Sequence, residues 1–145
     1  MPGEAPVEGG GLGYLLITSA HAWRTSLGHR LGPLGLTPAQ FFVVMAVHRR
    51  TRTGQPALSQ RQIAQKTGMD VNVVSQVIRA LERRGVLERG PHPSDSRALT
   101  VALSPSGSKL ATASSAIARR LNNEFFADAD NQLLGQQLGM LTKPI

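Results

Sequence analysis

The sequence has 145 residues, a length typical of one domain, and 41% of them are hydrophobic, which suffices for a packed core and excludes a disordered chain. It contains no cysteine, so disulfide scaffolds, thiolate zinc sites and cysteine nucleophiles are excluded. It shows neither an apolar run long enough for a membrane span nor the basic start of a secretory signal. We therefore expect a cytoplasmic protein without a membrane partner.

The net charge of +7 is concentrated in the middle of the chain. Residues 49–97 contain ten basic and four acidic side chains, which makes this segment +6 and leaves +1 for all other residues. This distribution indicates a polyanion-binding module within a nearly neutral scaffold. An ordinary solvated basic surface is the alternative, and charge alone does not separate the two.

The chain begins with a predicted tail and a long helix. Residues 1–11 are rich in Gly, Pro and Glu and lack an apolar period, so we expect them to be disordered. From Leu12 to Leu31 apolar residues recur every three or four positions, which predicts a helix of about five turns. Gly32 and Pro33 follow, and a helix does not easily continue through them.

The second predicted helix is central and buried. Thr37 and Gln40 form a capping box, and Pro38 suits the first helical position. The following run, residues 41–47, is apolar on nearly all sides, which is typical of a helix inside the core. The helix is expected to end in the basic, polar stretch of residues 49–54.

Two short helices with a tight turn between them come next. Ser59 and Gln62 form a second capping box, and Gly68 suits the end of that helix. Asp70 is a good N-cap for another helix, which runs to Arg84. Its predicted inner face consists of Val74, Val77, Ile78 and Leu81. This arrangement is typical of a helix-turn-helix.

A hairpin is predicted directly after the second of these helices. Residues 86–89 and 97–103 suit two strands, and the turn-rich residues 90–96 connect them. Leu99, Val101 and Leu103 alternate with smaller or polar residues, as in a half-buried strand. A hairpin in this position is the wing of a winged helix.

The C-terminal part of the chain is predicted to be helical. Ser104 and Pro105 start a helix that reaches Phe126 and is about 33 Å long. Its predicted apolar stripe consists of Leu110, Ser114, Ile117, Leu121 and Phe125. A last helix from Asp128 carries Leu133, Leu134, Leu138 and Leu141.

The order of these elements and one string of residues resemble the MarR family of bacterial transcription regulators. The string reads Leu-Glu-Arg-Arg-Gly-Val-Leu-Glu-Arg from Leu81, then Asp-Ser-Arg from Asp95, and then Leu-Ser-Pro-Ser-Gly up to Gly107. The resemblance covers residues from about 12 to 142. It implies a mainly α fold with a small β wing, in which a winged helix-turn-helix is flanked by N- and C-terminal dimerisation helices.

The corresponding divisions of the chain are a disordered tail (1–11), a dimerisation helix (12–36), a winged helix-turn-helix DNA-binding domain (37–103) and C-terminal dimerisation helices (104–145). The flanking helices have more apolar surface than a wing domain can cover, which favours burial against a second copy. In a dimer on DNA, two recognition helices must lie about 34 Å apart.

By this resemblance the chain is a homodimeric, sequence-specific regulator of transcription that binds double-stranded DNA. Members of the family are usually repressors of a pseudo-palindromic operator and are released by a small phenolic or lipophilic effector. We expect no cofactor, no metal and no catalytic residues.

The predicted contacts to base edges lie on the polar face of the recognition helix. Asn72 and Gln76 have amides that can pair with adenine, Ser75 can bond several bases, and Val73 can touch a thymine methyl group. Many family members have Arg where Gln76 stands, which alters the expected operator sequence. The predicted phosphate contacts are Arg61, Arg79, Arg83, Arg84 and Arg89.

The wing and the effector site complete the expected binding residues. By resemblance, Arg97 enters the minor groove, and Asp95 either orients this arginine or fixes the turn. In the family, effectors bind between the dimerisation helices and the wing domain. The polar side chains of suitable elements are His21, Arg24 and His48, of which Arg24 can pair with a carboxylate. Trp23 lies on the apolar stripe and is expected in the core.

Three other functions have requirements that differ from this sequence pattern. An enzyme is disfavoured because the sequence has no GxSxG, phosphate-loop or HExxH motif, and its four histidines lack the spacing of metal ligands. An architectural, non-specific DNA-binding protein without an effector needs basic charge but no base-reading face. A winged helix used for protein contacts does not need the basic charge around the recognition helix and the wing.

Overall fold

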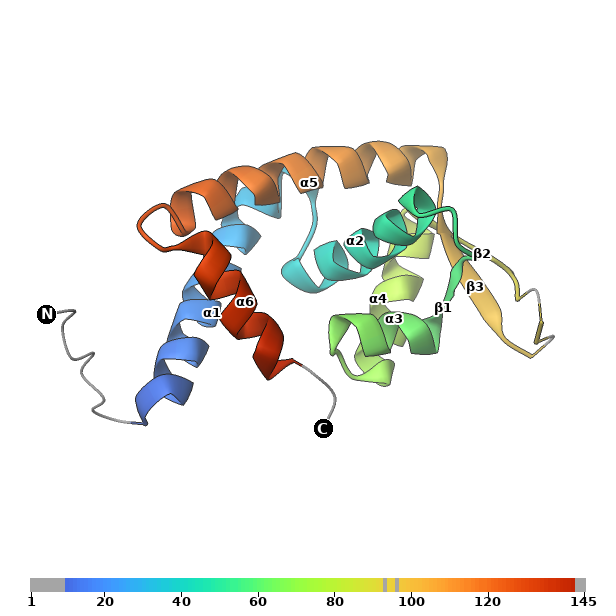
Figure 1. Cartoon of the computed structure of the whole chain (residues 1–145). Coiled ribbons are helices and arrows are strands. Elements are labelled where there is room, and N and C mark those ends of the chain that lie inside the picture. The colour runs from blue at the N-terminus through green and yellow to red at the C-terminus, as the bar shows by residue number, and fades with distance from the viewer. Residues whose placement is uncertain (1–9, 93, 96, 143–145) are drawn as a thin grey trace, which may run out of the picture.

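The computed structural model describes residues 10–92, 94–95 and 97–142. In chain order the elements are α1 (Gly11–Leu31), the 3₁₀ helix η1 (Gly32–Leu34), α2 (Pro38–Arg52), β1 (Leu58–Ser59), α3 (Gln60–Thr67), α4 (Val71–Arg83), β2 (Leu87–Pro91), β3 (Leu99–Leu103), α5 (Pro105–Phe125) and α6 (Asn131–Leu141). Helix α5 extends along the molecule, with the sheet at one end and α1 and α6 at the other (Figure 1). This confirms the predicted mainly α fold with a small β wing.

The predicted starts of α2, α3 and α4 are confirmed by their caps. Thr37 with Gln40 and Ser59 with Gln62 form capping boxes in which each pair exchanges two hydrogen bonds. The carboxylate of Asp70 accepts a hydrogen bond from the Asn72 N–H, which starts α4. Because caps satisfy backbone groups of the first turn within a few residues, they are readable from local sequence.

The core is built around α2. Phe41 and residues 43–47 are buried, as predicted, and Phe42 is half-buried. Helix α2 packs against α1, α3, α4 and α5. Val74, Ile78 and Leu81 of the predicted inner face of α4 are fully buried, whereas Val77 is half-buried.

The sheet has three antiparallel strands in the order β1-β3-β2, one more than predicted. The additional strand, β1, pairs Leu58 with Val101 and Ser59 with Thr100. It has two residues, too few to show an alternating pattern in the sequence. The wing strands also begin later than expected, at Leu87 and Leu99.

The predicted inward position of Leu99 is wrong. Leu99 is 48% exposed, while Thr100 is buried and its Oγ1 donates to the Pro91 carbonyl oxygen at 3.3 Å. Leu99 pairs with Pro91 of β2, but it lies one residue beyond β1, which ends opposite Thr100.

Helix α5 uses small residues to approach its neighbours. Its buried residues are Gly107, Ala111, Ser114, Ala118 and Leu121. The predicted stripe is therefore rotated: Leu110 and Ile117 are half-buried and Phe125 is 36% exposed. Small side chains at the centre of a contact let helix backbones come closer together. The predicted stripe was based on the large apolar residues and therefore missed the face with the small ones.

Two side-chain contacts join α1 to α5. The Trp23 indole N–H donates to the Asn122 side-chain oxygen at 2.8 Å. The Arg30 guanidinium binds the Glu124 carboxylate, and this hydrogen bond and charge hold the pKa of Glu124 below its usual value. Both contacts are exposed, so they orient the two helices more than they stabilise them.

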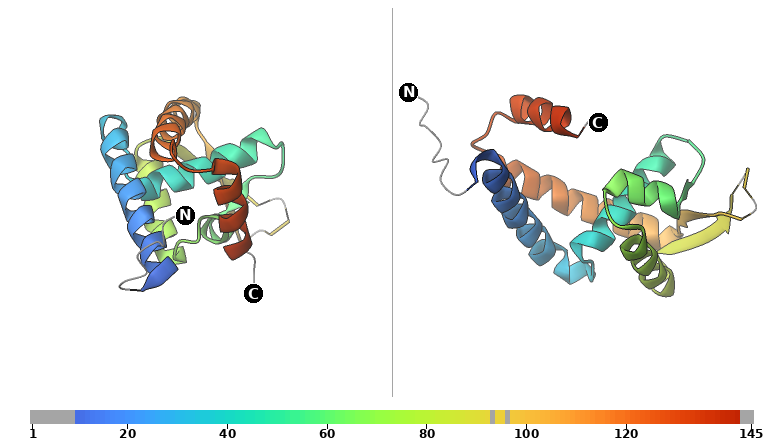
Figure 2. Two further views of the ribbon diagram at one scale, coloured as in Figure 1. Left: turned by 60° about the vertical axis from the view of Figure 1, so that its left-hand side comes forward. Right: turned by 90° about the horizontal axis from the view of Figure 1, so that it is seen from below.

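The outer ends of the molecule expose apolar side chains. None of the residues of α6 is buried, and this helix stands apart from the body of the protein (Figure 2). The N-terminal part of α1 is exposed as well, with Leu12 at 84% and Ile17 at 71%. The exposed apolar set on these two helices comprises Leu12, Tyr14, Leu15, Leu16, Ile17, Leu133, Leu138, Met140 and Leu141.

Two predicted boundaries at these ends need correction. Gly11 is already helical, and residues 1–9 of the predicted tail lie outside the described residues. Helix α6 begins at Asn131 rather than near Asp128, because the Asp130 carboxylate caps it by accepting from the Leu133 N–H at 3.0 Å.

Among the described residues, no single helix is long and apolar enough to cross a membrane. Gly11–Leu34 and Pro38–Arg52 reach the required length and composition only as a pair, which is bent by 79°.

Candidate DNA-binding surface

The predicted base-reading residues lie at the beginning of α4. Asn72, Val73 and Gln76 are exposed, and Ser75 is half-buried. The opposite side of the helix packs into the core through Val74 and Ile78. The amphipathic pattern thus holds one face of α4 in the protein and presents amides, a hydroxyl and an apolar side chain on the other.

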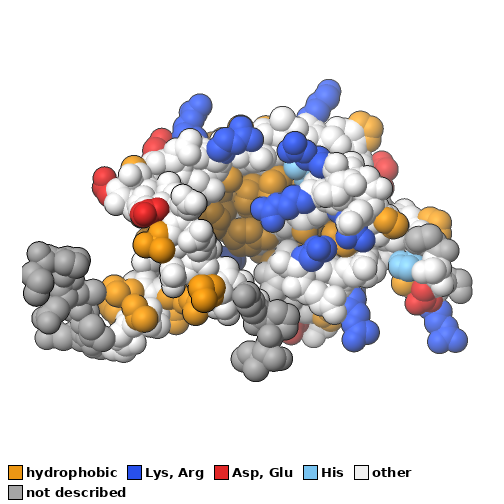
Figure 3. All heavy atoms as spheres, viewed as in Figure 1, with side chains coloured by type: hydrophobic (Ala, Val, Ile, Leu, Met, Phe, Trp, Pro, Cys, Tyr) orange, Lys and Arg blue, Asp and Glu red, His pale blue; other side chains and the backbone are white. Residues whose placement is uncertain are grey.

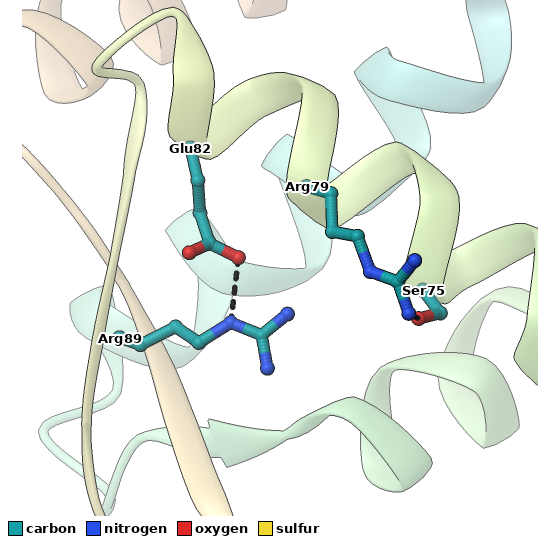
Figure 4. A network of polar contacts seen from close by, with 4 residues as sticks. All are labelled: Ser75, Arg79, Glu82 and Arg89. Atoms are coloured by element: carbon teal, nitrogen blue, oxygen red, sulfur yellow. Dashed lines mark hydrogen bonds and ion pairs between the residues drawn. The ribbon is translucent and has the colours of Figure 1, made fainter.

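Arginines of α4 and β2 are held by neighbouring polar groups. Arg79 extends along α4 and donates to the Ser75 Oγ at 3.1 Å, so both side chains occupy the same face (Figure 4). Arg89 reaches across from β2, and its Nε lies 2.6 Å from the Glu82 carboxylate (Figure 4). Glu82 therefore neutralises part of the charge of one predicted phosphate contact.

A groove of about 870 Å³ runs between α3 and the wing. Arg61 of α3, Arg89 of β2 and Arg97 of the wing line it, together with Val71 from the first turn of α4. The basic side chains are thus brought together beside the start of α4. Its other lining residues are Ser59, Gln60, Gln62, Gln65, His92, Asp95, Ala98 and Leu99.

The wing turn is organised by side-chain acceptors. The Asp95 carboxylate accepts from the Arg97 backbone N–H at 3.0 Å, which is the turn-fixing role of the two predicted for Asp95. The Nδ1 of His92 accepts from the Ser94 and Asp95 N–H groups at 3.1 and 3.0 Å. His92 was not predicted as a site residue, because its role depends on the folded turn.

Arg83 and Arg84 are both exposed at the end of α4. Arg84 donates to the carbonyl oxygens of Gly35 at 2.6 Å and Leu34 at 3.2 Å. Its guanidinium is therefore engaged with the connection between α1 and α2, rather than presented for the predicted phosphate contact.

A second cavity, of about 510 Å³, opens between α1, α2, α3 and α5. Its apolar wall contains Trp23, Phe41, Phe42, Met45 and Ala46, and Figure 3 shows this hydrophobic hollow bordered by basic side chains. The Trp23 and Phe42 rings are stacked, with centroids 6.1 Å apart.

The basic residues of this cavity are Arg49, Arg50 and Lys66. Arg50 is held in place by the Pro56 carbonyl oxygen at 2.6 Å and the Gln55 side chain at 2.8 Å. Arg49 and Lys66 are exposed. Sequence reasoning noted the basic end of α2 but did not connect it with an aromatic cavity, because Lys66 and Trp23 meet there only through the fold.

The predicted effector residues do not line this cavity. His21 is exposed on α1, and His48 is half-buried on α2. Arg24 lies beside the cavity, with its guanidinium carbon 5.7 Å from the centre of the Phe42 ring, a cation–π distance. Trp23, expected in the core, is half-buried and lines the cavity. Within the described ranges, no group of three or more His, Asp or Glu residues is placed to hold a metal ion.

Comparison with known proteins agrees with this architecture. The sequence model of the MarR family matches residues 34–98, which include the helix-turn-helix and most of the wing. The HTH-type transcriptional regulator YdcH of Bacillus subtilis is 30% identical over 128 residues, which is 86% of each chain.

Solved structures share the fold. A MarR mutant from E. coli in complex with operator DNA has a TM-score of 0.78 and 23% identity, over 91% of this chain and 94% of that one. CouR from Rhodococcus jostii RHA1, bound to p-coumaroyl-CoA, has a TM-score of 0.77 and 20% identity, over 96% and 93% of the two chains. With its recognition helix and wing in place, the chain belongs to the MarR family of DNA-binding transcriptional regulators.

Proposed function

We propose that the protein is a homodimeric repressor that reads a pseudo-palindromic operator and is released by a small anionic effector. The observation that carries the DNA-binding part is the junction of α4 with the basic groove. Val71, at the start of the reading helix, lines the same groove as Arg61 and Arg97. A major-groove element and a wing cation are thus adjacent, as required to contact neighbouring grooves of one duplex.

The proposal assigns a contact with DNA to most of the predicted site residues. Asn72 and Gln76 pair with adenine edges, and Val73 packs on a thymine methyl group. Arg97 enters the minor groove. Phosphate contacts come from Arg61 and Arg83. Arg79, which is bound to Ser75, and Arg89, which is bound to Glu82, add positive charge nearby. Arg84 is left out of this set, because two of its donors bind the carbonyl oxygens of Gly35 and Leu34 and hold the guanidinium at the connection before α2.

The exposed apolar set on α1 and α6 supports the homodimer. These side chains lie on two helices at the end of the molecule away from the wing (Figure 1). An apolar surface of this kind on a soluble fold is typical of a protein interface. Burial against a second copy gives a two-fold dimer with two recognition helices.

The cavity beside α2 supports an effector with an apolar ring and an anionic group. The stacked Trp23 and Phe42 rings suit a flat apolar body, while Arg49 and Lys66 suit a carboxylate or phosphate. A neutral phenol uses the aromatic wall but leaves both cations unpaired.

Selection of bound duplexes from a random pool tests the DNA-binding proposal. We expect an inverted repeat with half-sites about one helical turn apart, and binding that persists in an excess of random duplex. Sequence-indifferent binding would instead indicate an architectural protein. A reporter under a promoter that overlaps the selected site then distinguishes repression from activation.

Thermal unfolding with matched ring compounds tests the effector proposal. We expect benzoate or 4-hydroxybenzoate to raise the Tm and the corresponding neutral amides to have less effect, because a ligand stabilises the state that binds it. Lys66→Gln should weaken the response to the acids, and Lys109→Gln, on the outer surface of α5, should not. Equal responses to acid and amide would contradict an anionic effector.

A further inference from the structure

Besides core packing, the side chain of Arg84 links the recognition helix to the N-terminal part of the molecule by two hydrogen bonds. Arg84 is the C-cap residue of α4, and its two bonded carbonyl groups lie about fifty positions earlier, at the end of η1. Carbonyl groups at the end of a helix carry partial negative charge, so a guanidinium there is well placed electrostatically. Two donors on one planar group also fix a direction, which a single hydrogen bond does not.

Gly35 makes this contact possible. It has a φ of 68°, in the left-handed region, and a Cβ added there would lie 3.3 Å from the Arg84 Nη2. The guanidinium therefore rests directly on the backbone of the connection. This connection begins where α1 ends and is followed by α2 from Pro38, so the contact links α4 to the helix that carries the exposed apolar set.

Because the Arg84 contact lies at one end of α4, a small change of tilt there displaces the proposed base-reading residues at the other end. Arg84 lies at one end of α4, and Asn72 and Val73 lie at the other. Thirteen residues span about 20 Å in a helix. A tilt of about 10° around the Arg84 end therefore moves the reading end by about 3 Å, close to the rise of one base pair.

We propose that Arg84 determines the half-site spacing that the protein accepts, by fixing the tilt of α4 relative to α1. This inference rests on the proposed dimer and operator. If α1 joins the two subunits, the tilt of each α4 relative to α1 sets the distance between the two reading ends. Arg84 is thus a positioning residue that acts on specificity without touching DNA.

Affinity for a series of spacings provides the first test. The duplexes carry the selected half-sites at the selected spacing and with one base pair inserted or removed. We expect the wild-type protein to lose at least tenfold in affinity when the spacing changes. Arg84→Ala should reduce this ratio to about threefold or less, and Arg84→Lys, which retains the charge but not the paired donors, should fall between them.

Arg83→Ala is the matched control, since it removes the same charge from the adjacent residue. We expect it to weaken binding to all spacings by a similar factor and to leave the ratio unchanged. A ratio in Arg84→Ala equal to that of the wild type or of Arg83→Ala would overturn the proposal. A wild-type protein that binds no duplex specifically would contradict the proposed function instead.

A distance measurement tests the tilt without DNA. The chain has no cysteine, so Thr25→Cys on α1 and Val73→Cys on α4 accept nitroxide labels without background. Dilution with unlabelled protein restricts the signal to the distance within one chain, whatever the oligomeric state. We expect Arg84→Ala to broaden the distance distribution and Arg83→Ala to leave it narrow, while circular dichroism confirms that both variants are folded. An unchanged distribution in Arg84→Ala would overturn the inference.

Discussion

At the scale of single residues, equal charge does not mean equal function. Arg50, Arg84 and Arg89 direct their guanidinium groups to acceptors of the protein itself. Of these three, only Arg89 lines the groove beside α4, together with Arg61 and Arg97. A cation bound to backbone carbonyls has a structural role, because moving to a phosphate would leave those carbonyls without their partner. The charge of +6 in residues 49–97 therefore overstates the number of phosphate contacts.

Arg97→Ala should weaken operator binding by about 1–3 kcal/mol, because a cation in a narrow minor groove lies in a concentrated negative potential. Arg52→Ala removes the same charge at the end of α2, outside the lining of the groove, and should have a smaller effect. Mobility-shift titrations at one fixed salt concentration measure both. Equal losses in the two variants would show that Arg97 acts through general charge alone.

At the scale of elements, the Ser-Pro-Ser-Gly segment joins the start of α5 to the turn after α4. The buried Ser104 hydroxyl accepts from the Gly107 N–H at 3.0 Å and bonds the Gly85 carbonyl oxygen. Ser106 donates to the same carbonyl oxygen at 3.0 Å. These contacts fix the end of α4 and the start of α5 relative to each other, next to the wing strands. The Ser-Pro-Ser-Gly motif therefore has a structural role.

Gly107→Ala should destabilise the fold by about 1–3 kcal/mol, because overpacking forces backbone shifts. A Cβ at Gly107 would lie 2.1 Å from the Val86 carbonyl oxygen, which is backbone and cannot move away alone. Gly139→Ala is the matched control, since nothing lies within 4 Å of its Cβ and alanine favours a helix. Urea unfolding of the three proteins measures the difference. Similar midpoints for wild type and Gly107→Ala would contradict the close packing.

At the scale of the whole molecule, the two ends differ in what they leave exposed. The end with α3, α4 and the wing presents polar and basic side chains to the groove, and the end with α1 and α6 presents apolar ones. The aromatic cavity lies between them, against the buried helix α2. A ligand in this cavity would contact both halves, which is the arrangement that the proposed coupling between an effector and DNA binding requires.

Ile17→Glu should shift the protein from dimer to monomer. Ile17 is 71% exposed, so the change leaves the fold of one chain intact but introduces a charge into the proposed interface. Light scattering at micromolar concentration should give twice the chain mass of 15.5 kDa for the wild type and one chain mass for the variant. Thr25→Glu adds the same charge at a polar position of α1 and should remain dimeric. A monomeric wild type would contradict the dimer.

The ends of most helices and the buried and polar faces of α4 followed from the sequence, because the determinants are local. Thr37, Ser59 and Asp70 bond backbone groups two or three residues away, and the inner face of α4 repeats along its own turns. The start of α6 was misplaced because Asp128 and Asp130 are both good caps two positions apart, and the fold uses the second.

The contacts of individual cations, the third strand and the cavity beside α2 were decided by tertiary structure. Arg84 meets Gly35, Lys66 shares a cavity with Trp23, and Leu58 pairs with Val101. Each pair joins residues more than forty positions apart. Local periodicity says which side of a helix faces inward, but contacts between distant segments depend on how all elements pack at once. The sequence by itself therefore determined that a basic winged helix is present, and only the packed chain decided which of its arginines bind acceptors of the protein itself.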